Sequence, residues 1–131
     1  MTACTVLLIE DNDQNRYLVT FLLEHHGCTV VAAADGMSGI AAATAFAPDL
    51  VLLDIQLPRM DGYAVARQLR EIAALVDVPI IAVTSYAMSG DRSKAIAAGC
   101  NGYIEKPINP DTFVDDILAF LPPSQQALAT W

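Results

Sequence analysis

The chain has 131 residues, 54% of them hydrophobic, and its 15 acidic and 7 basic residues give a formal net charge of −8. This length suits one compact domain, and the acidic balance argues against direct binding to nucleic acid or to anionic lipid. The first residues carry no basic-then-apolar signal, and the apolar runs are shorter than the ~20 residues of a membrane helix. The 3 cysteines are isolated and match neither a disulfide framework nor a metal site, so we expect a cytoplasmic protein that is not inserted in a membrane.

Short apolar runs alternate with segments of helix length along the chain. The runs predict buried parallel strands, which cover Val6–Ile9, Thr29–Ala33, Leu50–Leu53, Val78–Val83 and Gly102–Ile104. The segments between them predict helices, over Asp13–His26, Ser38–Phe46, Gly62–Ala73 and Asp91–Ala98. Gly27 and Gly99 follow two of these helices and are expected to stop them.

A fifth helix is expected to begin at Asn109-Pro110, a capping residue followed by proline at the first helical position. Its apolar residues recur at helical spacing and predict a stripe that faces the core, at Phe113, Ile117, Phe120 and Leu121. Pro122-Pro123 would end this helix, so residues 1–123 are the expected domain and residues 124–131 a tail or the start of a linker. Five strands alternating with five helices predict a doubly wound α/β domain.

Polar residues gather at the carboxyl ends of four predicted strands, which is where such sheets bind ligands. The strand ends carry Glu10-Asp11, Asp54, Thr84-Ser85 and Glu105-Lys106-Pro107. The remaining strand, the second, ends in Ala33-Ala34, as expected of an edge strand away from a site. We therefore predict one site, built by four strands, at this edge of the sheet.

The residue types at these strand ends indicate phosphoryl chemistry. Asp11, Asp54 and Glu10 form an oxygen-rich set that suits a hard cation, and the small number of protein ligands favours Mg²⁺. Lys106 supplies a positive charge for a phosphoryl oxygen, and the Thr84 hydroxyl supplies a hydrogen bond. A carboxylate beside Mg²⁺ and a lysine can act as the nucleophile toward a phosphoryl donor. The sequence has neither GxxxxGK[ST] nor a G-x-G spacing, so nucleotide-binding loops of those types are excluded.

The segments IEDND, LLDIQLPRMDG, VTSYA and YIEKPI, in this order and at these separations, resemble the receiver domain of two-component response regulators. The resemblance covers essentially the whole chain and implies a flavodoxin-like sheet of strand order 2-1-3-4-5. It also implies that Asp54 is the phosphoacceptor and a metal ligand, that Asp11 binds the metal directly, and that Glu10 acts through water. Gln56 would bind the metal through its backbone carbonyl.

The same resemblance implies roles for the last two strands. Thr84 and Tyr103 match a switch pair, in which the hydroxyl moves toward the phosphoryl group and the aromatic ring turns inward. Lys106-Pro107 matches a peptide bond that is usually cis. The chain resembles a stand-alone regulator, and its AMSGD segment is similar to that of single-domain cell-division regulators.

A regulator of this kind would accept its phosphoryl group from a histidine kinase or a histidine phosphotransfer protein in a Mg²⁺-dependent reaction. It would then signal to a downstream target through protein contacts, so we expect a phosphoacceptor and not a conventional enzyme. The side chains that select the kinase are expected on the first helix, at Gln14, Asn15 and Tyr17, and in the loop after Lys106.

Gln56 and Tyr86 bear on how long the phosphorylated state lasts. In the family, side chains at these positions lie near the approach of the hydrolytic water. Tyr86 is bulky and not basic near neutral pH, and the amide of Gln56 cannot accept a proton. We therefore expect slow dephosphorylation, which Tyr86→Ala should accelerate.

Three other interpretations are open at this point. A phosphatase of the haloacid-dehalogenase type would need an Asp as acid and base two residues after the nucleophile, where this chain has Gln56. A receiver-like module that is never phosphorylated is disfavoured by the complete set of acidic, hydroxyl and lysine residues. A receiver fragment of a longer hybrid kinase or regulator remains compatible with residues 124–131 as a linker.

Overall fold

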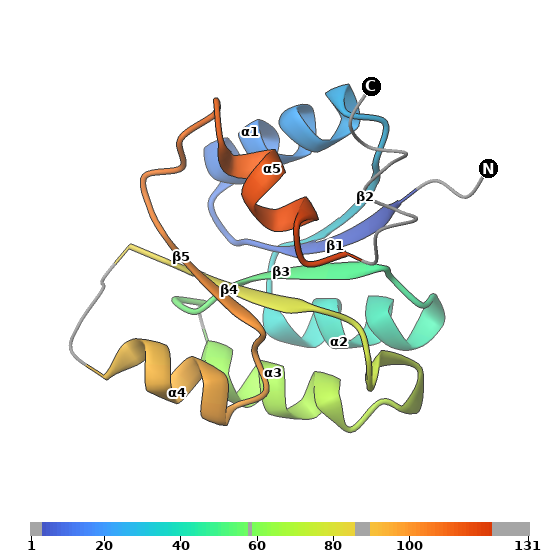
Figure 1. The fold of residues 1–131 in the computed structure, drawn as a ribbon. Coiled ribbons are helices and arrows are strands. Elements are labelled where there is room, and N and C mark those ends of the chain that lie inside the picture. The colour runs from blue at the N-terminus through green and yellow to red at the C-terminus, as the bar shows by residue number, and fades with distance from the viewer. Residues whose placement is uncertain (1–3, 58, 86–89, 122–131) are drawn as a thin grey trace.

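A parallel sheet of five strands in the order β2-β1-β3-β4-β5 forms the centre of the molecule (Figure 1). The computed structural model describes residues 4–57, 59–85 and 90–121. The strands are β1 (Thr5–Ile9), β2 (Thr29–Ala33), β3 (Leu50–Asp54), β4 (Ile80–Thr84) and β5 (Gly102–Glu105). This order confirms the predicted doubly wound, flavodoxin-like fold. It places the topological switch point between β1 and β3, where ligands bind in such sheets.

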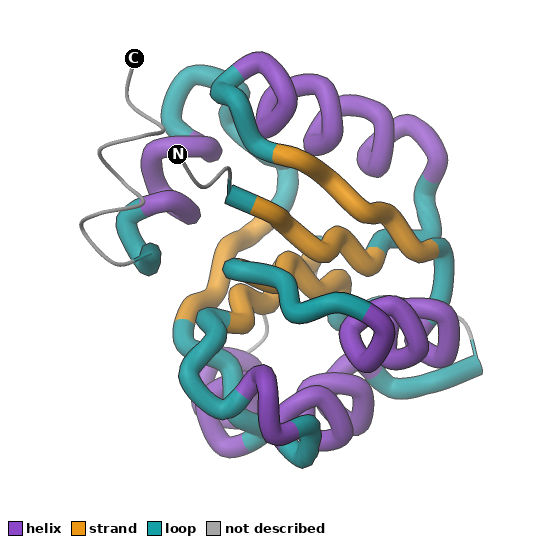
Figure 2. Tube along the Cα trace, turned by 90° about the vertical axis from the view of Figure 1, so that its right-hand side faces the viewer, coloured by secondary structure: helices purple, strands orange, loops and turns teal. Residues whose placement is uncertain are grey.

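Helices cover both faces of the sheet: α1 and α5 lie on one face, and α2, α3 and α4 lie on the other (Figures 1 and 2). Their bounds are α1 (Asp13–His25), α2 (Gly36–Ala45), α3 (Gly62–Arg70), α4 (Asp91–Ala97) and α5 (Phe113–Leu118). A short 3-10 helix, η1 (Ala73–Leu75), follows α3.

Alternate residues of β1 belong to the two cores on opposite faces of the sheet. Val6 and Leu8 pack in the core that α1 and α5 cover, whereas Leu7 and Ile9 pack in the core that α2, α3 and α4 cover. All four are buried, as the two-residue period of a strand requires. Every residue of β3 and β4 is buried. The predicted site residues therefore stand at the ends of strands that the core holds in place.

Capping residues start the helices that follow β1 and β3. The Asn12 side chain accepts a hydrogen bond from the Asn15 backbone N–H at 2.9 Å, and the Asp61 side chain accepts one from the Tyr63 N–H at 3.0 Å. A Cβ atom at Gly62 would lie 2.5 Å from the Cα of Ile55. Only glycine therefore lets α3 begin this close to the segment that follows β3.

The last helix begins later than predicted. The Asn109 side chain accepts a hydrogen bond from the Asp111 backbone N–H at 3.0 Å, and residues 110–112 form turns. The predicted start at Asn109-Pro110 is wrong because these turns satisfy the local backbone groups before helical geometry begins at Phe113.

The predicted stripe of this helix is only partly right. Phe113, Ile117 and Leu121 are buried, but Phe120 is 40% exposed and lies beyond the end of α5. Phe120 packs over the backbone of β5, since a Cβ atom at Gly102 would lie 2.6 Å from its Cζ.

Two further expectations are corrected. α3 ends at Arg70 and not at Ala73, and the Arg70 guanidinium donates hydrogen bonds to the carbonyls of Leu75, Val78 and Gly99 at 2.7–2.8 Å. β2 was predicted to be buried, but two of its five residues are exposed. It pairs with β1 alone, so only one of its edges is covered by another strand.

Residues 122–131 lie outside the described residues, so the boundary at residue 123 and the tail stay predictions. Within the part of the chain that the structure describes, none of the helices has the length and apolar character needed to cross a membrane. The three cysteines are buried and free.

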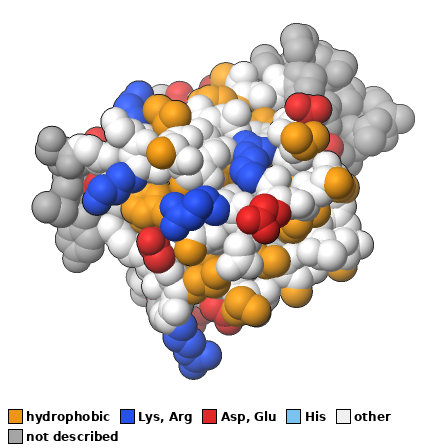
Figure 3. Space-filling view, turned by 90° about the horizontal axis from the view of Figure 1, so that it is seen from below, with side chains coloured by type: hydrophobic (Ala, Val, Ile, Leu, Met, Phe, Trp, Pro, Cys, Tyr) orange, Lys and Arg blue, Asp and Glu red, His pale blue; other side chains and the backbone are white. Residues whose placement is uncertain are grey.

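The basic side chains are unevenly distributed. Five of the 7 Lys and Arg residues are Arg59, Arg67, Arg70, Arg92 and Lys94. Figure 3 shows Lys and Arg side chains among hydrophobic ones on the face seen from below, over α3 and α4. The other two are Arg16 and Lys106, which therefore supply the positive charge near the acidic strand ends.

Candidate functional site

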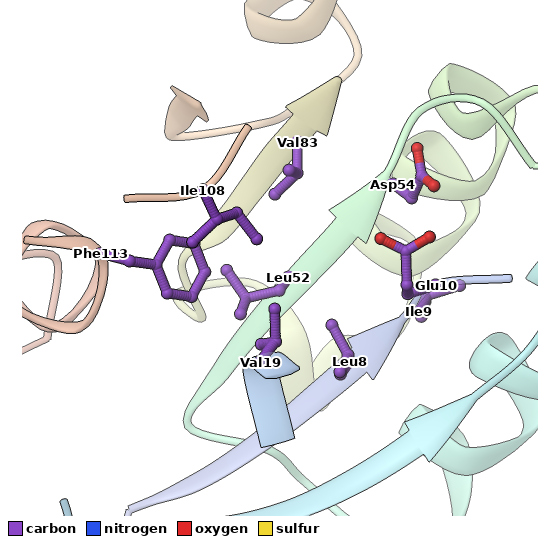
Figure 4. Close-up of a pocket in the computed structure, with 9 residues that line it drawn as sticks. All are labelled: Leu8, Ile9, Glu10, Val19, Leu52, Asp54, Val83, Ile108 and Phe113. Carbon is purple, nitrogen blue, oxygen red and sulfur yellow. The ribbon is translucent and has the colours of Figure 1, made fainter. Parts of the chain in front are cut away.

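Three polar residues are buried where β1, β3 and β4 end. Glu10 is 3% exposed, Asp54 4% and Thr84 2%. Glu10 directly follows β1, and Asp54 and Thr84 are the last residues of β3 and β4. Figure 4 shows the carboxyl groups of Glu10 and Asp54 facing each other at the ends of their strands, beyond a group of apolar side chains. The structure thus brings together predicted site residues from three strands.

Asp11 completes an acidic cluster with Glu10 and Asp54. One carboxylate oxygen from each of the three residues lies within 4.8 Å of the others. Asp11 is exposed, whereas the other two are buried, so solvent reaches the cluster at Asp11. Several carboxylate oxygens at this spacing suit a hard divalent cation such as Mg²⁺.

Lys106, which follows β5, contacts both buried carboxylates. Its Nζ lies 2.9 Å from Glu10 Oε1 and 3.2 Å from Asp54 Oδ2. Burial alone would lower the pKa of the Lys106 ammonium, but hydrogen bonds and attraction from Glu10 and Asp54 outweigh burial and raise this pKa above its ordinary value. Lys106 is therefore held in its charged form between the two carboxylates.

One lysine does not balance the negative charge of the cluster. Burial, followed by the contact with Glu10, raises the pKa of Asp54 to about 6. The Gln56 backbone N–H and Lys106 act in the opposite direction, and they do not cancel the rise. The site is thus short of positive charge at neutral pH, and its residues fit a bound cation.

Gln56 connects the end of β3 to the end of β4. Its backbone N–H donates to Asp54 Oδ1 at 2.9 Å, and its side-chain Nε2 donates to Thr84 Oγ1 at 2.8 Å. Its Oε1 accepts a hydrogen bond from the Ser85 backbone N–H at 3.0 Å. The predicted role of the Gln56 backbone carbonyl as a metal ligand stays a prediction.

Tyr103 of β5 is half-buried and packs against the core that α2, α3 and α4 cover. Its hydroxyl is the one buried side-chain polar atom without a hydrogen-bond partner among the described residues. The Arg92 guanidinium lies 5.8 Å from the centre of the ring. The ring therefore points inward, as a core aromatic does, and its role as a switch stays a prediction. Tyr86 lies outside the described residues.

A groove borders the acidic cluster on the side of α1. It has a volume of about 470 Å³ and is lined by Asn15, Leu18, Ser85, Lys106, Pro107 and Ile108. The peptide bond between Lys106 and Pro107 is cis. The groove joins the first helix to the loop after Lys106, the two segments on which kinase recognition was predicted.

Two contacts of the site were not anticipated from the sequence. Arg16 Nη1 donates to the Glu10 backbone carbonyl at 2.8 Å, and the Asn12 backbone N–H donates to Glu10 Oε2 at 3.2 Å. Both hold the segment between β1 and α1 in place. The spacing of Asp13 and Arg16 indicates an ion pair, which the structure contains, but nothing in the sequence indicates that Arg16 also reaches backbone.

Comparison with known proteins places most of the chain in a described protein family. Residues 6–118 match the family model described as response regulator receiver domain. The polar-differentiation response regulator DivK of Brucella anthropi is 37% identical over 117 residues, which are 89% of this chain and 95% of the relative.

Solved structures of the same kind superpose closely. The chemotaxis protein CheY4 of Vibrio cholerae has a TM-score of 0.88 and 27% identity, covering 92% of this chain and 100% of that one. The receiver domain of a sensor histidine kinase from Pseudomonas aeruginosa has a TM-score of 0.83 and 33% identity, covering 91% and 98%. That structure holds a magnesium ion coordinated in its active site cleft.

Proposed function

The chain belongs to the response regulator receiver domain family, and on that basis we propose that it is a phosphorylation-dependent signalling switch with Asp54 as its phosphoacceptor. The observation that carries the proposal is the position of Asp54. This carboxylate ends the central strand β3, is 4% exposed, and contacts Lys106 at 3.2 Å. A second buried carboxylate, Glu10, and the exposed Asp11 lie beside it.

In the proposed reaction an Asp54 carboxylate oxygen attacks the phosphorus of a phosphohistidine. An O–P bond forms, the N–P bond breaks, and the histidine imidazole leaves with the electron pair and takes up a proton. The Lys106 ammonium offsets the negative charge of the phosphoryl oxygens, and the Thr84 hydroxyl donates a hydrogen bond to one of them. No residue acts as a general base, because the Asp54 carboxylate is already deprotonated when it attacks.

Mg²⁺ is the cofactor in this proposal. Asp11 and Asp54 would hold it through carboxylate oxygens, Gln56 through its backbone carbonyl, and Glu10 through a water molecule. The bound ion supplies the positive charge that the cluster lacks and offsets the charge of the phosphoryl oxygens.

Asp11→Asn should weaken Mg²⁺ binding about tenfold, because it removes one of few direct protein ligands. The same change should stabilise the metal-free protein by about 0.5–1 kcal/mol, since one pair of like charges is relieved. Calorimetric titration with Mg²⁺ and thermal unfolding without it measure the two effects. Asp13→Asn removes an exposed charge nearby and should leave the Mg²⁺ affinity unchanged, and equal affinities for wild type and Asp11→Asn would show that Asp11 is not a ligand.

The proposed donor is a histidine kinase or a histidine phosphotransfer protein, and the proposed output is contact with a downstream protein. Recognition of the donor would use the outer side of α1, where Tyr17 is 75% and Phe21 56% exposed, and the groove next to it. A cytoplasmic location follows from this role. A receiver that forms part of a longer hybrid kinase or regulator would use the same site.

Tyr17→Ala should slow phosphotransfer from the kinase or phosphotransfer protein about tenfold, because an exposed aromatic side chain at the docking surface is lost. Profiling against the kinases of the source organism would first identify the donor. Labelling by acetyl phosphate needs no docking and should keep its wild-type rate. Val76→Ala removes another exposed apolar side chain, 66% exposed and directly after η1 instead of on α1, and should change neither rate. An equal loss with both phosphodonors in Tyr17→Ala would contradict a docking role.

A phosphatase with an aspartyl intermediate is a weaker candidate. Gln56 stands where such enzymes carry an acid–base Asp, and its side chain is hydrogen-bonded to Thr84 and Ser85. We propose that the protein assists its own phosphorylation and loses the phosphoryl group slowly.

The experiment that tests the proposed function is incubation with acetyl phosphate and Mg²⁺, followed by mapping of the phosphoryl group by mass spectrometry. The label is expected on Asp54 alone and only when Mg²⁺ is present. A label on another residue, or none, would contradict the proposal.

A further inference from the structure

The side chain of Gln56 joins two segments of the site by a pair of hydrogen bonds, which we call the Gln56 bridge. Nε2 donates to Thr84 Oγ1 at 2.8 Å, and Oε1 accepts from the Ser85 backbone N–H at 3.0 Å. The backbone N–H of the same residue donates to Asp54 Oδ1 at 2.9 Å. Gln56 therefore contacts the proposed phosphoacceptor with its backbone and the end of β4 with its side chain.

The two groups in the bridge are suited to bind a phosphoryl group. A phosphoryl group brings about two negative charges and three strong acceptor oxygens, so it needs several hydrogen-bond donors close to Asp54. β4 lies next to β3, with Val83 paired to Asp54, and Thr84 and Ser85 follow Val83. The Thr84 hydroxyl and the Ser85 N–H are therefore potential donors at the carboxyl end of the strand adjacent to β3.

The bridge occupies the Ser85 donor and fixes the position of the Thr84 hydroxyl before any phosphoryl group is present. Gln56 Oε1 accepts the Ser85 N–H, and the bond from Nε2 holds the Thr84 hydroxyl beside the amide. The carboxamide oxygen of Gln56 thus accepts the Ser85 N–H in the way that a phosphoryl oxygen would accept it.

We propose that the Gln56 bridge opposes phosphorylation: the carboxamide must release the Ser85 N–H and move away from the Thr84 hydroxyl before these two groups bind the phosphoryl group. This inference rests on the function proposed above and concerns the regulation of that same site. Ser85 is exposed and Gln56 is half-buried, so water can replace the broken bonds and the opposing effect is modest.

Beryllofluoride, which mimics a phosphoryl group on an aspartate, measures the effect at equilibrium without a kinase. Gln56→Met keeps the length of the side chain and the backbone carbonyl but removes both hydrogen bonds. We expect it to bind beryllofluoride about fivefold more tightly than wild type in calorimetric titrations with Mg²⁺ in excess. Gln68→Met makes the same chemical change at an exposed position of α3 and should bind like wild type.

A second pair of variants tests whether the effect passes through the bridge. Thr84→Val removes one of the two bridged groups, so Gln56→Met in that background should raise the affinity by a smaller factor than in the wild-type background. The same factor in both backgrounds would show that Gln56 acts by another route.

Amide hydrogen exchange measures the bridge itself. The Ser85 N–H should exchange slowly in wild type and in Gln68→Met, and faster in Gln56→Met. Fast exchange in the wild type, or equal or weaker beryllofluoride binding by Gln56→Met, would overturn the proposed bridge while leaving the phosphoacceptor role intact. Failure of both wild type and Gln56→Met to bind beryllofluoride would contradict the proposed function itself, and the bridge proposal with it.

Discussion

Asp54→Asn is expected to abolish phosphorylation completely. The wild type should gain a phosphoryl group from acetyl phosphate with Mg²⁺, whereas the variant should gain none, because an uncharged amide is too weak a nucleophile to replace the carboxylate. Asp54 is the carboxylate that ends β3, and its Oδ2 lies 3.2 Å from Lys106 Nζ. Intact-protein mass spectrometry measures the gain directly.

Asp13→Asn is the matched control for this experiment. Asp13 is an exposed acid at the start of α1 that pairs with Arg16, and its side chain is 88% exposed. Its replacement should leave labelling at the wild-type level. A label that persists in Asp54→Asn would transfer the phosphoacceptor role to another residue.

The same Asp54→Asn substitution should stabilise the metal-free protein at neutral pH. The pKa of Asp54 is about 6 in the folded protein, above the ordinary value of 3.8, so between these values the folded chain binds a proton that the unfolded chain has lost. The stability associated with this proton is fully present below pH 3.8 and is lost as the pH rises through 6. Relative to wild type, Asp54→Asn should therefore gain stability from pH 4 to pH 7, by roughly 3 kcal/mol, because one pKa unit corresponds to about 1.4 kcal/mol. Urea unfolding at the two pH values measures the difference, and a constant difference would contradict the raised pKa.

Lys106→Met should destabilise the metal-free protein at pH 7 by roughly 2–4 kcal/mol. Glu10 and Asp54 are 3% and 4% exposed, and the substitution removes the cation that contacts both, leaving two buried carboxylates together. The loss should shrink near pH 5, because Asp54 takes up a proton more readily once the attraction of Lys106 is gone. Added Mg²⁺ should restore part of the stability.

Lys94→Met is the control, because Lys94 is the only other lysine and is exposed on α4. Denaturant unfolding of both variants with and without Mg²⁺ gives the comparison. Equal stability of Lys106→Met and Lys94→Met at pH 7 would mean that Lys106 does not balance the buried carboxylates.

The fold could be predicted because its central strands are buried on both faces. β1, β3 and β4 are continuous apolar runs, and such runs between helix-length segments favour few arrangements other than a doubly wound sheet. The partial exposure of β2 was missed although the strand was expected at an edge, because an apolar run does not show how much of an edge strand its neighbours cover. The start of α5 was misplaced because Asn109 followed by proline is compatible with a helix start and with the turn that forms.

Only the site residues that stand at the ends of strands could be placed together from the sequence. Glu10, Asp54 and Thr84 each stand where a buried run stops, so their placement together follows from parallel strands alone. The side chain of Gln56 could not be placed in this way, because it follows the strand by two residues and its partners Thr84 and Ser85 are 28 and 29 residues away. The hydrogen-bond partners of such a polar side chain depend on how the loops pack. No local sequence pattern predicts these partners.

The order in which a ribosome produces the sheet has a consequence for signalling. Lys106 lies 52 residues after Asp54 and follows β5, the last strand in both the chain and the sheet. The ribosome makes the chain from its N-terminus. A chain made only as far as β4 therefore contains the acidic cluster of Glu10, Asp11 and Asp54 but lacks Lys106, which contacts Glu10 and Asp54. The strand that completes the sheet also leads into that lysine, so an unfinished or truncated copy lacks the cation that contacts Glu10 and Asp54 in the proposed phosphoacceptor site. Under the proposed function, only copies whose translation has passed β5 would be able to accept a phosphoryl group.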